Sequence, residues 1–260
     1  MVFSEILKTS PLKLKILELL TDNPRTLSEL SRNLNKAKST LSFQIKPLID
    51  LGLIRKVKMG GNTYYETTEL GIIVRGRIVE LLKLRDVLMN AGDFFRNHDL
   101  SPIPKNLLNE IHMLRGCKVL VKKNPYELHC EWLDILKGSE WVYGLSSVYH
   151  PNFPELFKNL AKDREVKIIL TEDVFCKVKS EYKDQLQEFL TYGRLFVCKN
   201  AKLTFIVAEK GFTLNLYDLN GAYDPLKVLV CSTGESVEWG LKLFDHYLAQ
   251  SKEVEDINID

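Results

Sequence analysis

The chain has 260 residues, of which 45% are hydrophobic and 27% are charged, and its formal net charge is +2. These proportions are ordinary for a soluble globular protein and exclude collagen-like, low-complexity and wholly disordered chains. The apolar runs are far shorter than the ~20 residues that span a bilayer, and we see no basic-then-apolar leader. We therefore expect a cytoplasmic protein of one large domain or two small ones, each with its own core.

Positive charge is concentrated in the first quarter of the sequence. Residues 1–68 hold eleven Lys and Arg against six Asp and Glu, a balance of +5, whereas residues 69–260 hold 25 against 28, a balance of −3. A local basic excess attracts polyanions to one end of a protein. Double-stranded DNA is the partner that this pattern favours, and an ordinary solvated basic surface is the alternative.

The first 68 residues show the apolar period of a small helical domain. Ser10-Pro11 is typical of a helix start, and the following apolar stripe ends at Asp22-Asn23-Pro24. Thr26-Leu-Ser-Glu29 has the spacing of a capping box and predicts a second helix. A third helix begins at Ser39 after a short polar connection, so the pair predicts a helix-turn-helix. Within the third helix, Pro47 predicts a bend or an early end.

The third helix has a polar face opposite the apolar positions Leu41, Ile45 and Leu48. Hydroxyls suit phosphate oxygens and base edges, glutamine can pair with adenine at two points, and lysine neutralises phosphate. This set is typical of a recognition helix in the major groove of DNA. The candidate DNA-binding residues here are Lys36, Lys38, Ser39, Thr40, Ser42, Phe43, Gln44 and Lys46.

From Leu53 the apolar period changes to two, which predicts a β-hairpin over 53–67 that turns at Gly60-Gly61-Asn62. A basic hairpin directly after a recognition helix is typical of the wing of a winged helix, where it touches phosphates or a minor groove. Its candidate DNA-binding residues are Arg55, Lys56, Lys58 and Asn62.

Residues 68–96 form one long helical pattern without proline. Its apolar stripe is wider than a small winged helix needs, so we interpret 69–96 as a linker and dimerisation helix of a homodimer. The alternative is a plain core helix of the next domain.

A loop with two prolines, 97–104, then marks a domain boundary. Beyond it, apolar stripes with helical spacing alternate with short apolar runs typical of strands. This alternation predicts an α/β sensor domain over 97–250, followed by an acidic tail over 251–260. We expect helices near 104–114, 125–137, 152–163, 174–191 and 234–250, and strands near 117–122, 140–145, 166–171, 194–198, 203–208, 212–217 and 227–232. The expected fold class is α+β: an N-terminal winged helix-turn-helix, a long linker helix and a C-terminal α/β sheet domain.

Two loops of this second domain follow predicted strands, where open α/β sheets bind their ligands. The second loop also opens a helix, whose N-terminus favours an anion, although Ser232-x-x-Glu235 spells a capping box as the alternative. The candidate ligand-binding residues are Ser146, Ser147, Tyr149, His150, Ser232, Thr233 and Glu235.

The cysteines and histidines show no spacing typical of a metal site, and the five cysteines never form Cys-x-x-Cys. We expect reduced, mostly buried thiols, no metal and no cofactor. A nucleophile elbow, a Walker loop and a dinucleotide fingerprint are also missing, so we predict no catalytic residue. His150 beside Tyr149 is the candidate base if the chain is an enzyme, and a hydrogen-bonded loop histidine otherwise.

Several blocks of the sequence resemble known regulators. Residues 39–53, with the hairpin that follows, resemble the winged helix of arsenical-repressor-like bacterial and archaeal regulators. Residues 98–104, 149–157, 168–172, 223–225 and 238–244 resemble signature blocks of an archaeal regulator family associated with methanogenesis control. This second resemblance covers nearly the whole chain.

The resemblance implies a winged helix followed by a sensor domain similar to the phospholipase-D fold. The His-x-Lys-x-x-x-x-Asp motif of that enzyme fold is missing, so a binding domain rather than a hydrolase is implied. The cysteine-based metal site of the arsenical repressors is missing as well, because the first cysteine is Cys117.

Our first hypothesis is a dimeric, sequence-specific transcriptional regulator whose second domain senses a small molecule or a protein effector. The alternatives are a phospholipase-D-type phosphodiesterase with a DNA-binding appendage, in which His150 replaces the nucleophile, and a second domain that serves only assembly.

Overall fold

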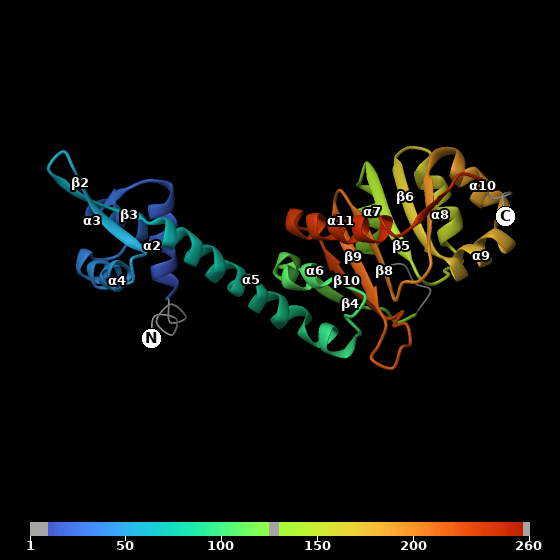
Figure 1. The fold of residues 1–260 in the computed structure, drawn as a ribbon, viewed down its shortest axis with the longest axis horizontal. Coiled ribbons are helices and arrows are strands. Elements are labelled where there is room, and N and C mark those ends of the chain that lie inside the picture. Colours follow the sequence, from blue (N-terminus) through green and yellow to red (C-terminus); the bar gives the residue numbers. More distant parts are fainter. Residues whose placement is uncertain (1–9, 125–129, 257–260) are drawn as a thin grey trace. The chain divides into compact units, whose positions relative to one another are not determined.

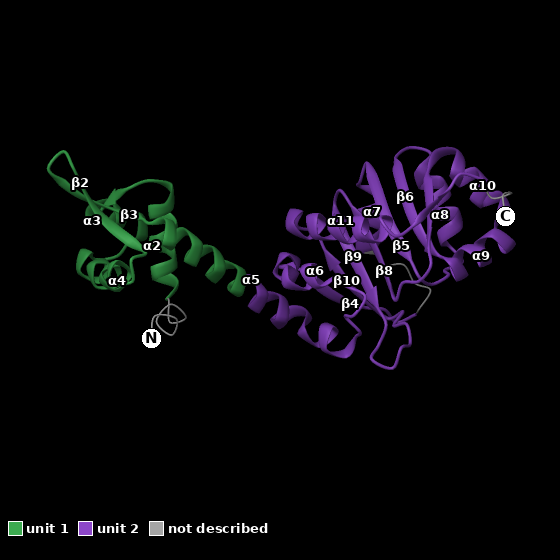
Figure 2. Cartoon of the chain, viewed as in Figure 1, with its two compact units in different colours: residues 1–82 green, residues 83–260 purple. Residues whose placement is uncertain are grey.

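The computed structural model describes residues 10–124 and 130–256, and its contacts divide the chain into two compact units, 1–82 and 83–260 (Figures 1 and 2). The division falls inside helix α5 (Glu69–Asn97), which confirms the long helix expected over 68–96. The chain was expected to divide at residues 68 and 97. The single observed division differs because the C-terminal part of α5 packs into the second unit, where Val87, Ala91 and Phe94 are buried.

Unit 1 combines helices α2 (Pro11–Asp22), α3 (Leu27–Leu34) and α4 (Lys38–Asp50) with a small sheet in the order β1-β3-β2. Its strands are β1 (Arg25–Thr26), β2 (Ile54–Met59) and β3 (Asn62–Thr67). The predicted capping box is confirmed, since the Thr26 hydroxyl accepts from the Glu29 N–H and the Glu29 carboxylate accepts from the Thr26 N–H. Gly60 and Gly61 both have positive φ, as a tight hairpin turn requires.

The core of unit 1 joins all three helices to the start of the hairpin. Its buried side chains are Ile16, Leu17, Leu20, Leu30, Leu41, Ile45, Leu48, Leu53 and Ile54. Helix α4 continues past Pro47 to Asp50, so an early end at the proline is wrong. Proline removes one N–H from the helix ladder, but the next residue, Leu48, is 1% exposed and anchors this end of the helix in the core.

Unit 2 is built on a twisted mixed sheet, which has eight strands within the described part of the chain (Figure 1). The strand order is β11-β7-β6-β5-β8-β9-β10-β4, in which β5, β6 and β7 are parallel and the remaining neighbours are antiparallel. The strands are β4 (Lys118–Val121), β5 (Trp141–Ser146), β6 (Glu165–Thr171), β7 (Arg194–Cys198), β8 (Leu203–Ala208), β9 (Gly211–Leu216), β10 (Lys227–Cys231) and β11 (Lys252–Val254).

Helices cover both faces of this sheet, because side chains alternate along each strand and form one apolar cluster on each side. One cluster contains Phe205, Phe212 and Trp239 and is covered by α11 (Gly234–Leu248), α6 (Lys105–Asn109) and the end of α5. The other contains Ile168, Ile206 and the inner faces of α7 (Cys130–Lys137), α8 (Phe153–Ala161), α9 (Glu172–Glu181) and α10 (Lys183–Tyr192). The expected α+β fold class is confirmed.

Several predicted elements need correction. The helix expected over 174–191 is two helices that meet at Tyr182. The region 104–114 holds α6 and a separate 3-10 turn, Ile111–Leu114. Residues 125–129 of the helix predicted over 125–137 lie outside the described residues. The expected acidic tail contains β11, which pairs with β7 and is held by two hydrogen bonds from Arg194 to Glu253, of 2.7 and 2.8 Å.

The expectation that the thiols are all reduced is wrong for one pair, because Cys117 and Cys231 form a disulfide. Strands β4 and β10 are antiparallel with Lys118 opposite Val230, and this register places the two cysteines opposite each other. They are 114 positions apart in the sequence, so spacing gave no signal of the pair. Cys176 and Cys198 are free thiols.

Helical glycines in unit 2 provide a test of this packing. A Cβ at Gly240 in α11 lies 2.5 Å from a ring carbon of Phe212, whereas at Gly92 in α5 its nearest neighbour is 4.0 Å away. Gly240→Ala therefore overpacks the core and destabilises the chain by ~1–3 kcal/mol. Gly92→Ala is the matched control and stabilises by ~0.5–1 kcal/mol, because alanine restricts the unfolded chain. Urea unfolding of both variants measures the difference, and equal effects contradict the packing described.

Candidate functional site

The polar face predicted for the third helix is the solvent-exposed face of α4. Ser39, Thr40, Ser42 and Phe43 are exposed, and the Phe43 ring is 75% exposed although it is a large apolar group. The three lysines of this face, Lys36, Lys38 and Lys46, are exposed as well. The hydrophobic side chains Leu41, Ile45 and Leu48 fill the opposite side of the helix.

Gln44 differs from its neighbours because it is half-buried and already has a partner. Its side-chain oxygen accepts a hydrogen bond from the Ser10 hydroxyl at 3.5 Å, where Ser10 also caps α2. A two-point contact with adenine needs both the oxygen and the amide nitrogen of glutamine. The Gln44 oxygen can accept a second hydrogen bond and its amide nitrogen can donate, so this long contact leaves both groups available.

The hairpin divides its basic residues between its two faces, because side chains alternate along a strand. Lys56 and Lys58 lie on one face, and neither forms an ion pair with any residue that the structure describes. Arg55 lies on the other face, where its Nε donates to Glu66 at 2.5 Å. This hydrogen bond raises the pKa of Arg55 and compensates its charge. Lys56 and Lys58 therefore supply the uncompensated charge of the hairpin.

A short turn connects the exposed helix face to the hairpin. Gly52 has φ +71°, and the Leu53 N–H donates to the Leu48 carbonyl at 2.8 Å, so β2 starts directly beside the end of α4. Asn62 is exposed at the far end of the hairpin, opposite Met59. We call the exposed face of α4 together with the hairpin the α4–hairpin surface.

Unit 2 contains a cavity of about 230 Å³ on the α7 and α8 side of its sheet. Aromatic rings, strand-borne polar groups and the loop after β9 surround it. Its lining residues are Lys122, Trp132, Val148, Tyr149, His150, Phe153, Thr204, Phe205, Ile206, Thr213, Asn215, Tyr223, Pro225 and Val228. We call it the Thr213 cavity.

The first predicted ligand loop contributes Tyr149 and His150 to this cavity. Burial and a hydrogen bond to Tyr182 raise the pKa of the Tyr149 hydroxyl, which donates to Tyr182 at 2.5 Å. Ser146 instead donates to the Val148 carbonyl and lines a smaller apolar cavity of about 60 Å³. The Ser147 N–H donates to Thr204 at 3.2 Å, so Ser147 supports a cavity residue.

The second predicted loop lies at the opposite end of the sheet, because β10 runs antiparallel to β5 through β8 and β9. The capping box predicted for Ser232 and Glu235 is wrong by one residue, since Thr233 and Ser236 cap α11. Glu235 pairs with Lys83 of α5 instead. Ser232, Thr233 and Glu235 therefore do not meet the other predicted ligand residues.

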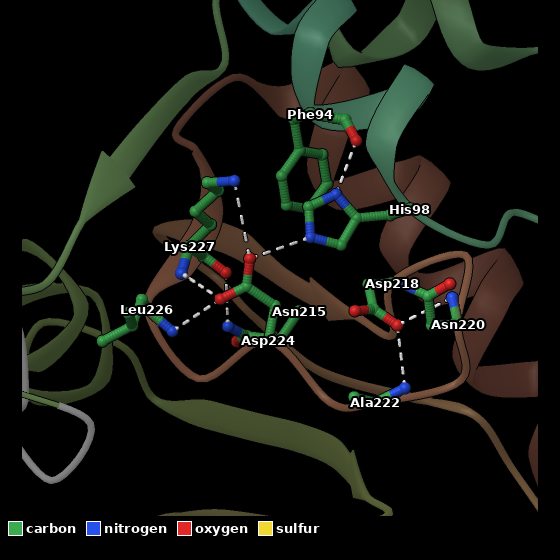
Figure 3. A network of polar contacts seen from close by, with 9 residues as sticks. All are labelled: Phe94, His98, Asn215, Asp218, Asn220, Ala222, Asp224, Leu226 and Lys227. Carbon is green, nitrogen blue, oxygen red and sulfur yellow. Dashed lines mark hydrogen bonds and ion pairs between the residues drawn. The ribbon is translucent and has the colours of Figure 1, made fainter.

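Sequence reasoning missed a buried contact between the end of α5 and the loop after β9. Figure 3 shows His98 between the Phe94 carbonyl, 2.6 Å from its Nδ1, and the Asp224 carboxylate, 3.2 Å from its Nε2. Both neighbours are hydrogen-bond acceptors, so the ring makes both hydrogen bonds only when it carries two protons. Both residues fall in blocks that carry the resemblance, but 126 positions separate them.

The Asp224 carboxylate is held by several donors at once. Burial alone would raise its pKa, but hydrogen bonds from the Leu226 N–H, His98 and the Lys227 N–H outweigh burial and lower the pKa of Asp224. Its two backbone hydrogen bonds measure 2.9 and 3.2 Å. Asp224 therefore fixes both its own loop and the last residues of α5.

Neither a metal cluster nor a membrane span is found in the described ranges. Within residues 10–124 and 130–256, His, Cys, Asp and Glu side chains never gather in threes at a site that could hold a metal ion. The helices described there are too short or too polar to cross a membrane.

Two family models match separate parts of the chain. Residues 10–56 match "Bacterial regulatory protein, arsR family", and residues 125–250 match "Methanogenesis regulatory protein FilR1, middle domain". A relative from Methanothrix harundinacea (strain 6Ac), methanogenesis regulatory protein FilR1, is 28% identical over 263 aligned residues, which cover 97% of this chain and 58% of the relative. The chain thus spans less than two thirds of that relative.

The chain also has some similarity to solved structures, with TM-scores below 0.5 for the two described here. TrmBL2, described as an archaeal chromatin protein, is 13% identical with a TM-score of 0.44, over 93% of this chain and 92% of that chain. Reduced HlyU from Vibrio cholerae N16961 is 28% identical with a TM-score of 0.27, over 32% of this chain and 84% of that chain.

Asp224→Asn tests the contact at the end of α5. The variant should be less stable than the wild type by ~1–3 kcal/mol at neutral pH, because the charge facing His98 is lost. The lowered pKa means that Asp224 stabilises the folded state above the pKa it has in the unfolded chain, and this stabilisation is lost as pH falls through its folded-state pKa. Urea unfolding should therefore show a gap between wild type and variant that closes in acid.

Asp218→Asn is the matched control in the same loop. Asp218 accepts from the Asn220 and Ala222 N–H groups, which an asparagine oxygen also satisfies (Figure 3). Its effect should be the smaller of the two. A gap for Asp224→Asn that stays constant down to strongly acidic pH is inconsistent with the charge-based account.

Proposed function

We propose that this chain is a sequence-specific, DNA-binding transcriptional regulator that contacts DNA through the α4–hairpin surface. The observation that carries the proposal is the exposed polar face of α4, with Phe43 at 75% exposure, directly beside a hairpin with two uncompensated lysines. The arsenical-repressor match over residues 10–56 supports it.

The two halves of the surface have different tasks in this proposal. Hydroxyl groups at Ser39, Thr40 and Ser42 suit phosphate oxygens and base edges, and the Phe43 ring suits a thymine methyl group. Lys56 and Lys58 neutralise phosphates and so contribute to affinity without reading sequence. Base preference therefore depends on α4, and salt dependence depends on the hairpin.

The paired substitution Lys56→Gln/Lys58→Gln should weaken binding to all DNA sequences. It should lower the slope of log affinity against log salt by about 0.9 for each phosphate contact that is lost. Lys183→Gln/Lys199→Gln removes the same charge from exposed positions of unit 2 and is the control. Gel-shift titrations over a salt series measure both, and identical slopes for the two pairs would remove the hairpin from the interface.

We also propose a homodimer that forms through α5. Leu70, Ile73, Leu81 and Leu88 are each 50–63% exposed, and the last three lie three, eleven and eighteen positions after Leu70. These intervals are close to whole helical turns, so the four side chains share one face of the helix. A second copy would bury this stripe and would present two recognition helices to a two-fold operator.

Leu81→Lys/Leu88→Lys should convert the dimer to a monomer, because two charges cannot be buried in an apolar seam. Affinity for a two-fold operator should fall at the same time. Met89→Lys is the control, since Met89 is 76% exposed but lies about 100° around the helix from Leu88. Sedimentation velocity gives the masses, and a Leu81→Lys/Leu88→Lys protein that still sediments as a dimer contradicts this interface.

Unit 2 is, in this proposal, an effector-binding domain similar to the phospholipase-D fold rather than a phosphodiesterase. The ring of His150 stacks on Phe153 at 4.5 Å, as an aromatic wall does. The match of residues 125–250 to the middle domain of a regulatory protein supports a regulatory role for this unit.

A further inference from the structure

Thr213 places a buried hydroxyl in the wall of the Thr213 cavity. The residue is 2% exposed, and its hydroxyl makes no hydrogen bond within the described part of the chain. Its strand neighbours Phe212 and Leu214 pack on the α11 side, so Thr213 points to the other side, where the cavity lies. The hydroxyl is therefore open to a polar group of a molecule bound in the cavity.

A second polar group lies beside it on the same face of β9. The Asn215 side chain donates through Nδ2 to the Lys227 carbonyl at 2.8 Å, which fixes the amide and leaves its oxygen as an acceptor. Figure 3 shows this orientation of Asn215. Thr213 and Asn215 together offer a donor and an acceptor to a ligand that carries a complementary pair.

Aromatic rings from the helix side also line the cavity. The Trp132 and Phe153 rings stack at 5.8 Å with an interplanar angle of 22°, and His150 continues the stack on Phe153. Among the described lining residues Lys122 is the charged one and none is an Asp or Glu, so this part of the lining offers a cationic ligand no counter-charge. The volume of about 230 Å³ suits a small molecule.

We propose that the Thr213 cavity binds a small, planar aromatic molecule that is not a cation and that carries a hydrogen-bonding group such as a carboxamide. We further propose that α5 responds to its occupancy through Asp224 and His98. The regulatory part rests on the proposed function, whereas the binding part does not.

The proposed response of α5 depends on the loop after β9, which both lines the cavity and contacts His98. Tyr223 and Pro225 line the cavity, and Asp224 between them holds His98, which directly follows α5. The Asp99 N–H also donates to the Tyr217 carbonyl at 2.8 Å, so the loop is attached to this end of α5 twice. A ligand that repositions Tyr223 therefore acts on the helix whose first residues belong to unit 1.

Three matched probes test the ligand class on the full chain: benzamide, benzylammonium and cyclohexanecarboxamide. Titration calorimetry should give benzamide a roughly millimolar Kd, as its size allows, and should give each of the other two weaker binding. The ligand class is overturned if none of the three binds, or if cyclohexanecarboxamide or benzylammonium binds as tightly as benzamide.

Two threonine variants locate the site. Thr213→Val keeps the shape of the side chain and should weaken benzamide by roughly 3–10-fold, because one hydrogen bond is lost. Thr191→Val, on exposed α10, removes a hydroxyl far from the cavity and should change nothing. Equal affinity of wild type and Thr213→Val overturns the site, even where benzamide binds.

The response is measured separately from binding. Saturating benzamide should change the DNA affinity of the wild type by at least about five-fold. Asp224→Asn should keep benzamide binding but lose this change. If benzamide leaves the DNA affinity of the wild type unchanged, the proposed role of Asp224 and His98 is overturned. If the wild type binds no DNA, the proposed function is overturned instead. The benzamide titration then still tests whether the Thr213 cavity binds a ligand.

Discussion

The packing of one side of α4 into the core of unit 1 determines what the rest of that unit presents to solvent. Leu41, Ile45 and Leu48 are at most 2% exposed, so rotation of the helix about its axis would expose leucine and isoleucine side chains. Exposure of each buried side chain costs roughly 1.5–3 kcal/mol. The polar side of α4 is therefore held outward by the packing of the apolar side.

In unit 2, the direction of the strands determines which loops and side chains lie close together. Three parallel strands resemble an ordinary α/β sheet, but β8, β9 and β10 alternate in direction beside them. This reversal separates the two loops that a parallel sheet would bring together. It also sets Thr204, Thr213 and Asn215 on one face, below the aromatic side chains of α7 and α8. A cavity with polar groups on its strand side and aromatic rings on its helix side follows from that register.

Local features were predictable from the sequence, and long-range ones were not. The capping box at Thr26 depends on residues three positions apart, and the hairpin turn depends on two adjacent glycines, so both were found. At Ser232 the same rule failed, because Thr233 and Ser236 have the same spacing one residue later, and serine also serves at the last position. Local chemistry alone does not choose between two such registers.

The disulfide joins residues 114 positions apart, the His98–Asp224 contact joins residues 126 positions apart, and the cavity is lined by residues that range from Lys122 to Val228. Their existence depends on strand register, which periodicity does not give. The strand β11 was missed because its three residues, Lys-Glu-Val, have the composition of a charged tail. They form a strand only by pairing with the edge of β7. For the α4–hairpin surface the sequence was sufficient, since short-range apolar spacing determines its two sides.

The central claim is that the exposed face of α4 reads DNA sequence. Genome-wide footprinting of the wild type beside Phe43→Ala/Ser42→Ala tests it most directly, because both side chains are exposed and their loss leaves the core intact. We predict that the wild type protects a limited set of sites with a shared two-fold sequence, and that the variant binds DNA without that preference. Protection of the same sites by both proteins would contradict the claim.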